Sequence, residues 1–108
     1  MVDRTHPLHL SEVAIRLRPL GLRLAIQRLD VFGSFASGKA TTGSDVDLLV
    51  TLDPNCDVST DELLDMAGEA EELVGVPVDF VLRHSLDKST NPETRRQILK
   101  TAVCIYGN

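Results

Sequence analysis

The sequence predicts an α+β fold, with a small mixed β-sheet and helices packed on one face. Three short apolar runs, at residues 26–32, 45–51 and 76–82, are typical of strands, and a stretch of helical period separates the last two. A strand–helix–strand unit of this length implies a right-handed crossover and a parallel pair of strands. With 108 residues and no internal repeat, the chain fits a single domain spanning residues 1–108.

A helix is predicted on the N-terminal side of the first strand. Apolar residues recur at helical spacing between Leu10 and Leu24, after a polar arm at residues 1–9. Pro19 and Gly21 both disfavour a straight helix interior, because proline lacks an N–H group and glycine is flexible. This helix should therefore kink or restart near them.

The other helices are predicted from their start and stop signals. Ser59, followed by Glu62 three residues later, forms a capping box at the start of a helix that Gly75 should end. After the third strand we expect a loop at residues 84–91 and a last helix over residues 92–103.

Composition narrows the classes of function. The net charge of −5 argues against nonspecific binding to nucleic-acid phosphates, and the 4% aromatic content offers no platform for stacking bases. Cys56 and Cys104 have no Cys or His partner at metal-ligand spacing. No apolar run approaches the roughly 18 residues of a membrane span, and the N-terminal residues do not resemble a signal peptide. We therefore expect a cytoplasmic protein that does not bind membranes.

The residues most suited to chemistry lie within positions 31–50. Gly33 and Ser34 directly follow an apolar run, and Asp45 and Asp47 alternate with apolar residues on the second strand. Residues i and i+2 of a strand share a face, roughly 7 Å apart, so two such carboxylates can share divalent cations. Glycine allows a close approach of the backbone, so the Gly-Ser pair could bring N–H groups and a hydroxyl against a phosphate.

Each part of this pattern also has a structural explanation. Alternating Asp residues often mark a solvated strand face, and a Gly-Ser pair often marks a turn. Asp79, between Val78 and Phe80 on the third strand, could also be solvated, although a charge among apolar residues needs a partner or a metal. The combination of these features on one chain favours the functional interpretation.

That combination resembles the signature of the nucleotidyltransferase superfamily that includes DNA polymerase β: Gly-Ser, a short gap, Asp-x-Asp on a strand, and a third Asp on a later strand. The spacing is most similar to that of minimal nucleotidyltransferase (MNT) proteins, and the resemblance runs from about Leu10 to Tyr106. It implies that Asp45 and Asp47 bind two Mg²⁺ ions, and that Asp79 binds one of them and acts as general base.

The resemblance also implies nucleotide contacts. Gly33 and Ser34 would hold the triphosphate of ATP, and Ser44 would either assist them or only shape the turn before the Asp-x-Asp pair. Many MNT proteins read Gly-Ser-x-Ala-Arg-Gly, whereas this chain has Ser37 at the Arg position. Lys39 is a nearby cation, but it lacks the planar fork with which arginine grips phosphate.

MNT proteins of this size resemble the antitoxins that are paired with HEPN-domain ribonuclease toxins. The function implied is Mg²⁺-dependent transfer of AMP from ATP to a tyrosine hydroxyl of the toxin, in a possible hetero-oligomer and without direct nucleic-acid contact. Two alternatives stay open: an antitoxin that neutralises its toxin by binding alone, and a small-molecule nucleotidyltransferase. Ser37 keeps the first of these open, and the lack of a second domain to enclose a substrate disfavours the second.

Overall fold

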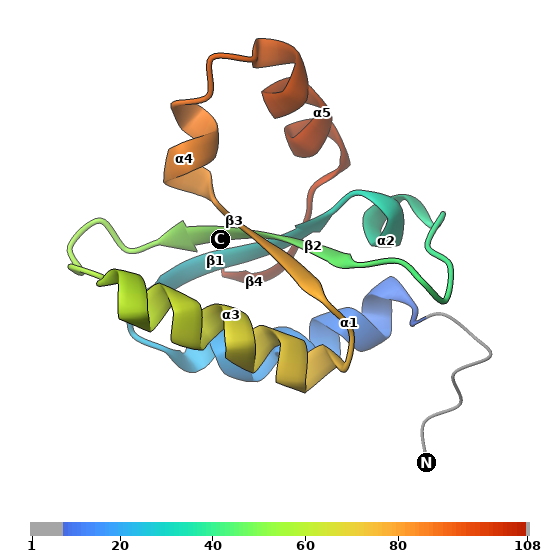
Figure 1. Ribbon diagram of the computed structural model, residues 1–108, viewed down its shortest axis with the longest axis horizontal. Helices are drawn as coiled ribbons and strands as arrows, with labels where there is room; N and C mark the ends of the chain where they lie inside the picture. Colours follow the sequence, from blue (N-terminus) through green and yellow to red (C-terminus); the bar gives the residue numbers. More distant parts are fainter. Residues whose placement is uncertain (1–7, 108) are drawn as a thin grey trace.

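The computed structural model describes residues 8–107, in which four strands form one sheet (Figure 1). The strands are β1 (Ile26–Phe32), β2 (Val46–Leu52), β3 (Val78–Leu82) and β4 (Val103–Gly107), in the order β3-β2-β1-β4. β1 is antiparallel to β2 and to β4, while β2 and β3 are parallel. The mixed sheet and the parallel pair are therefore as predicted. Most of the arm predicted at residues 1–9 lies outside the described residues.

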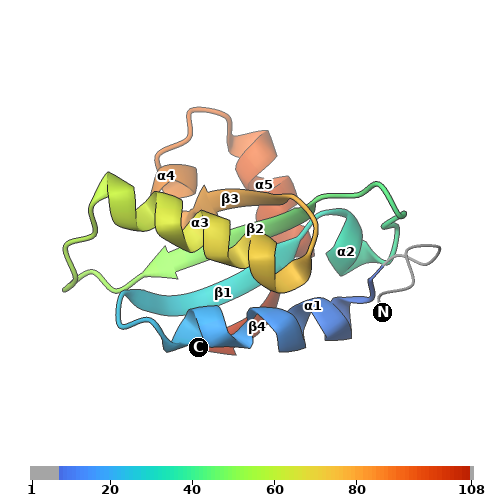
Figure 2. The same cartoon turned by 60° about the horizontal axis from the view of Figure 1, so that its bottom comes forward.

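The helices occupy both faces of this sheet. They are α1 (Leu10–Leu17), the 3-10 helix η1 (Arg18–Leu22), α2 (Ser34–Ser37), α3 (Thr60–Val74), α4 (Arg83–Asp87) and α5 (Pro92–Thr101). The helices α1 and α3 lie side by side beneath the strands, whereas α4 and α5 stand on the opposite side (Figures 1 and 2). The α+β class is confirmed. We expected the helices to pack on one face of the sheet. Helices α1 and α3 share one face, whereas α4 and α5 lie on the other.

The face covered by α1 and α3 contains the main hydrophobic core. On β2, Val46, Leu48 and Val50 are fully buried and belong to this core, because alternate residues of a strand point to the same face. The helical side chains packed against them are Val13, Leu17, Leu20, Met66, Ala70 and Val74. Asp47 and Leu49, between the buried positions of β2, consequently point to the other face.

Local sequence signals set the ends of these helices as predicted. Helix α1 ends at Leu17 and continues as η1, which contains both Pro19 and Gly21. The Ser59 hydroxyl accepts a hydrogen bond from the Glu62 N–H at 3.2 Å at the start of α3. Gly75 ends that helix in the left-handed conformation, with φ 76°.

The C-terminal segment differs from the prediction. The last helix ends at Thr101, and residues 103–107 form β4 beside β1 instead of continuing the helix. The predicted loop at 84–91 begins as the short helix α4. A strand of five residues whose partner lies about seventy positions away gives a weak local signal, since strand formation depends on tertiary context.

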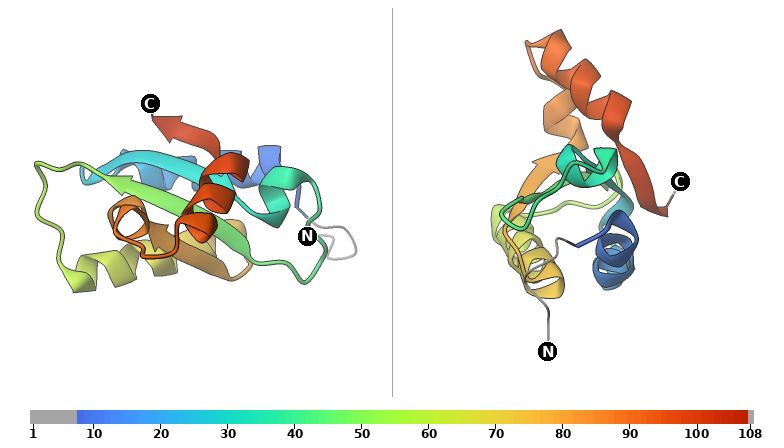
Figure 3. Two further views of the ribbon diagram at one scale, coloured as in Figure 1. Left: turned by 90° about the horizontal axis from the view of Figure 1, so that it is seen from above. Right: turned by 90° about the vertical axis from the view of Figure 1, so that its right-hand side faces the viewer.

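A second, smaller cluster attaches α4 and α5 to the sheet. Phe32, Leu49 and Leu86 are buried in it, and Ile98 and Ala102 pack against them. Helix α5 itself has no fully buried residue, and the end-on view shows α4 and α5 standing apart from α1 and α3 (Figure 3). Within residues 8–107, no helix has the length and apolar character needed to cross a membrane.

Candidate active site

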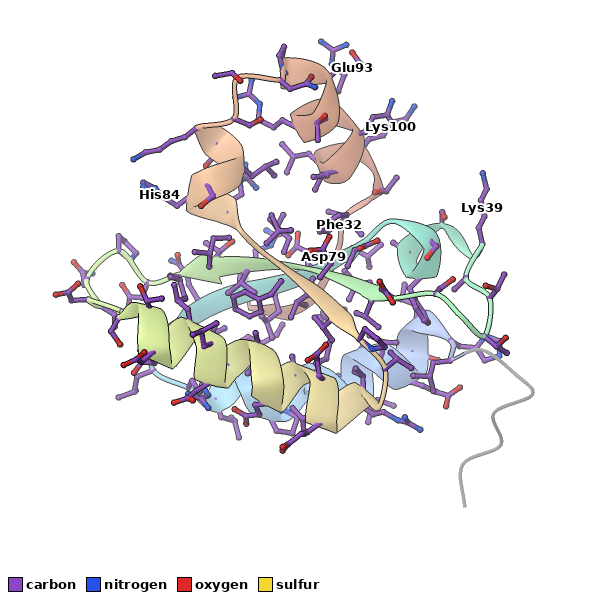
Figure 4. All side chains as sticks on the ribbon, in the orientation of Figure 1. Phe32, Lys39, Asp79, His84, Glu93 and Lys100 are labelled. Atoms are coloured by element: carbon purple, nitrogen blue, oxygen red, sulfur yellow. The ribbon has the colours of Figure 1, made fainter. Side chains whose placement is uncertain are left out.

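Asp47 and Asp79 lie on neighbouring strands. The parallel register of β2 and β3 pairs these two residues directly, so their side chains point to the same face of the sheet. Figure 4 shows Asp79 on the side where α4 and α5 stand, together with Phe32. The sheet therefore presents two carboxylates beside each other on the face opposite the main core.

Asp45 extends this pair into a cluster of three negative charges. It is exposed and lies two residues before Asp47, just ahead of the first residue of β2. Burial raises the pKa of the Asp47 carboxyl, and the negative charges of Asp79 and Asp45 raise it further. Asp47 is thus the centre of the cluster, and both neighbours repel its charge.

The charge and donor atoms of these carboxylates suit a divalent cation. Carboxylate oxygens are the ligands that Mg²⁺ prefers, and Mg²⁺ is usually held by one or two of them together with substrate phosphates. Among residues 8–107, no group of three or more acidic, His or Cys side chains is placed so that it could hold a metal ion by itself. A site that shares its metal with phosphates does not need such a group. The repulsion at Asp47 favours cation binding, because a bound divalent ion reverses the local charge.

Gly33 lies directly against the Asp47 carboxylate. Its φ of 72° belongs to a region that side-chain-bearing residues rarely adopt, and a Cβ atom there would overlap Asp47 Oδ2. The preceding residue, Phe32, is the β1 partner of Asp47. A glycine at this position therefore allows the chain to turn from β1 into α2 beside the carboxylate.

The hydrogen bonds of this turn modify the role expected for Gly33. Its N–H, which was predicted to face a phosphate, donates to Thr101 Oγ1 at 3.3 Å. The Ser34 carbonyl accepts the Lys39 N–H at 2.9 Å and so closes the end of α2. Ser34, the first residue of α2, remains a predicted phosphate ligand through its side chain.

Ser44 and Lys39 lie at opposite ends of the loop between α2 and β2. The Ser44 hydroxyl accepts the Thr41 N–H at 2.8 Å, so the structure supports its role in shaping the turn before Asp45. Lys39 is exposed and points away from Asp79 in Figure 4. Its predicted contact with phosphate would require a different side-chain conformation.

A further carboxylate, Asp30 on β1, is committed to an ion pair. It is only 5% exposed, and Arg28 binds it through two hydrogen bonds, Nε to Oδ1 at 2.7 Å and Nη2 to Oδ2 at 3.2 Å. The hydrogen bond and charge of Asp30 raise the pKa of Arg28 above its ordinary value. Asp30 is therefore satisfied within the fold and does not enlarge the predicted metal set.

Thr101 is the residue near the site that the sequence analysis missed. The antiparallel register pairs Val31 with Val103, and extending it by two residues places Thr101 opposite Gly33. The sequence contains no local signal for this contact, because the contact depends on β4, which was not predicted.

The profile of the nucleotidyltransferase domain family matches residues 12–105. This chain belongs to that family.

Two relatives carry a more specific name. Protein adenylyltransferase MntA of Thermococcus cleftensis is 30% identical over 77 residues, which cover 71% of this chain and 76% of the relative. A Methanocaldococcus jannaschii protein that also bears the name protein adenylyltransferase is 32% identical over 80 residues, covering 74% of this chain and 77% of its own length.

Solved structures share the fold. A structure described as a minimal nucleotidyltransferase superposes with a TM-score of 0.69 at 29% identity, covering 89% of this chain and 95% of the other. A toxin–antitoxin complex with AMP-PNP gives 0.64 at 20% identity, covering 94% and 75%. The complex of a tri-AMPylated Shewanella oneidensis HEPN toxin with its MNT antitoxin gives 0.56 at 16% identity, covering 92% and 70%. At such identities these two complexes show the fold alone.

Proposed function

We propose that this chain is a Mg²⁺-dependent protein adenylyltransferase that transfers AMP from ATP to a tyrosine hydroxyl of a HEPN-domain toxin, and that it acts as the antitoxin of the pair. The observation that carries this proposal is the in-register pair of Asp47 and Asp79, with Asp45 two residues earlier, in a member of the nucleotidyltransferase family. The names of the relatives and the AMPylated toxin in a structurally similar complex support the choice of a protein acceptor.

The three carboxylates have distinct roles in this proposal. Asp45 and Asp47 would hold two Mg²⁺ ions, and Asp79 would share one of them. Bound Mg²⁺ neutralises the charge that develops on the transferred phosphate and its leaving group. Ser34 binds the triphosphate, and Gly33 leaves room for the Asp47 carboxylate beside the turn.

Asp79 also serves as the general base. Its strand, β3, is at the edge of the sheet and its side chain is exposed, so a hydroxyl from another protein can reach it. The hydroxyl oxygen forms a bond to the α-phosphorus of ATP while its proton moves to Asp79. The bond from the α-phosphorus to the bridging oxygen breaks, and pyrophosphate leaves with that electron pair.

Intact-protein mass spectrometry of the toxin tests this proposal. With wild-type protein, ATP and Mg²⁺, the toxin should gain mass in steps of one AMP. Asp79→Asn should abolish the gain but leave the toxin complex able to form, because loss of a base affects the transition state more than docking. Asp65→Asn, which changes an exposed carboxylate on α3, is the matched control and should transfer normally.

A second function, neutralisation by binding alone, is favoured by one observation. Ser37 occupies the position at which the family pattern has arginine, and its hydroxyl bonds only weakly to the Ser34 carbonyl, at 3.4 Å. A ribonuclease assay run beside the mass measurement separates the two functions. A toxin that stays unmodified yet is fully inhibited by both the wild type and Asp79→Asn would support binding alone and reject transfer.

A further inference from the structure

We infer that Thr101 is a positioning residue for the carboxylate site, because its hydroxyl fixes Gly33 and so holds the turn after β1 against Asp47. The inference deepens the proposed function, on which it rests, by adding a residue from the C-terminal segment to the nucleotide site. The link runs from Thr101 to Gly33 through a hydrogen bond, and from Gly33 to Asp47 through direct contact.

The Thr101 hydroxyl both accepts and donates hydrogen bonds. Its oxygen accepts the Gly33 N–H at 3.3 Å, and its hydrogen is directed to the carbonyls of Gln97 and Ile98 in the last turn of α5, each at 3.3 Å. The hydroxyl therefore satisfies a backbone donor of the site while it is oriented by the end of its own helix. Valine has nearly the same shape but lacks both of these interactions.

The β-sheet brings Thr101 to this place. β4 begins two residues later at Val103, whose partner is Val31, so the antiparallel register carries Thr101 past the end of β1 to Gly33. Packing supports the same position, because Ile98 and Ala102 contact the cluster that contains Phe32. Figure 4 shows Phe32 between the sheet and α5. Two features therefore hold Thr101 near the site: the apolar contacts of Ile98 and Ala102, and the pairing of β4 with β1.

Gly33 transmits the position of Thr101 to the metal ligands. Asp47 Oδ2 occupies the space that a Cβ atom on Gly33 would fill, so a shift of this turn moves the Gly33 backbone directly toward or away from the carboxylate. Asp47 is in turn the centre of the three negative charges. Metal and nucleotide chemistry needs ligands held within about half an ångström of their working geometry, so a loose turn should weaken the site.

Within residues 8–107, Thr101 Oγ1 is the hydrogen-bond acceptor of the Gly33 N–H. In Thr101→Val the Gly33 N–H loses its acceptor in a partly buried position. An unsatisfied donor there costs more stability than the loss of donor and acceptor together. Thr101→Ser keeps the hydroxyl and should restore the bond. Thr94→Val removes the hydroxyl of an exposed threonine on the same helix and is the matched control. Thr101→Ala is a second hydroxyl-free variant in case the valine variant does not fold.

Two measurements that do not depend on catalysis test the inference. The exchange rate of the Gly33 amide hydrogen, followed by NMR, should rise about tenfold in Thr101→Val and stay near the wild-type rate in Thr101→Ser and Thr94→Val. The dissociation constant for Mn²⁺ alone, measured by electron paramagnetic resonance, should increase about threefold or more in Thr101→Val and recover in Thr101→Ser. In the transfer assay, Thr101→Val should lower kcat about tenfold with the KM for toxin unchanged.

The inference is overturned if Gly33 exchange is unchanged in Thr101→Val, or if exchange rises while Mn²⁺ affinity stays at the wild-type value. The second result would make the bond structural only. Failure of the proposed function is recognised separately, because wild-type protein would then add no AMP to the toxin. In that case the exchange and Mn²⁺ measurements still decide whether Thr101 positions the site.

Discussion

The two faces of the sheet differ in how many apolar side chains they bury. The face under α1 and α3 is a continuous apolar core, in which Val13, Leu17 and Met66 are completely buried. The opposite face has a small cluster around Phe32 and leaves α5 without a fully buried residue. It is this second face that carries Asp47 and Asp79.

The difference shows how one strand can contribute to the core through one face and carry the proposed site on the other. On β2, Leu48 points into the main core, whereas Asp47 beside it points to the opposite face, next to Asp79. Repulsion among the carboxylates lowers the stability of the fold, and the burial of apolar side chains on the opposite face compensates for this loss. Substitutions in the main core should therefore act mainly on stability, whereas substitutions of the carboxylates should act mainly on ligand binding.

The largest effect on stability is expected in the main core. Met66 is fully buried, and Met66→Ala should lower the free energy of unfolding by about 3 kcal/mol, because it removes apolar contacts and leaves a cavity. Leu86→Ala, in the small cluster, should cost about half as much, since fewer side chains surround it. Urea denaturation of both variants measures this ratio. Equal losses would show that the two faces contribute alike to stability.

Gly33→Ala should damage both stability and ligand binding. The positive φ and the overlap with Asp47 Oδ2 together should cost about 2 kcal/mol in the free energy of unfolding, and Mn²⁺ affinity should fall. Gly68→Ala is the control, because a Cβ atom at this position of α3 meets nothing and should stabilise the helix by about 0.5–1 kcal/mol. Denaturation and Mn²⁺ titration check both variants. An unimpaired Gly33→Ala protein would contradict the close contact with Asp47.

The sequence alone predicted the class of fold, the parallel β2–β3 pair and the ends of α3, since these depend on periodicity and capping residues such as Ser59 and Gly75. It also identified Asp47 and Asp79, which the register then placed side by side. It did not predict β4, α4 or the contact of Thr101 with Gly33. These features arise from pairing between distant parts of the chain, for which a single sequence has no local signal.

Asp47→Asn should raise stability in the absence of metal. The pKa of Asp47 is raised in the folded protein, so its ionised form costs stability at every pH above that pKa. The variant should gain about 0.5–1 kcal/mol in the free energy of unfolding at pH 8, a modest value because the group is partly solvated. The gain should disappear as the pH falls through the folded pKa to the unfolded pKa, where the wild-type carboxyl is protonated.

Thermal unfolding with and without Mg²⁺ provides the control for this prediction. Mg²⁺ should raise the Tm of the wild type and leave that of Asp47→Asn unchanged, because the variant lacks the central carboxylate. If Asp47→Asn were less stable than the wild type in EDTA at pH 8, repulsion at Asp47 would not be the dominant effect.

The smallest effect is expected from Ser37→Arg. Ser37 is exposed at the end of α2, so an arginine there has room and could supply the bidentate phosphate contact that the family pattern includes. We expect transfer of AMP to the toxin to become a few times faster, with stability unchanged. Ser37→Lys is the control, since it adds the same charge without the planar fork. An equal gain in the two variants would indicate a general effect of charge.

Calorimetric titration of ATP tests most directly whether the carboxylate face is the nucleotide site. Wild-type protein should bind ATP only when Mg²⁺ or Mn²⁺ is present, and the double variant Asp45→Asn with Asp47→Asn should lose this binding while remaining folded. A double variant of Asp61→Asn with Asp65→Asn, on exposed residues of α3, should bind as the wild type does. Equal ATP affinity in the wild type and the Asp45/Asp47 double variant would contradict the assignment of the site to this face.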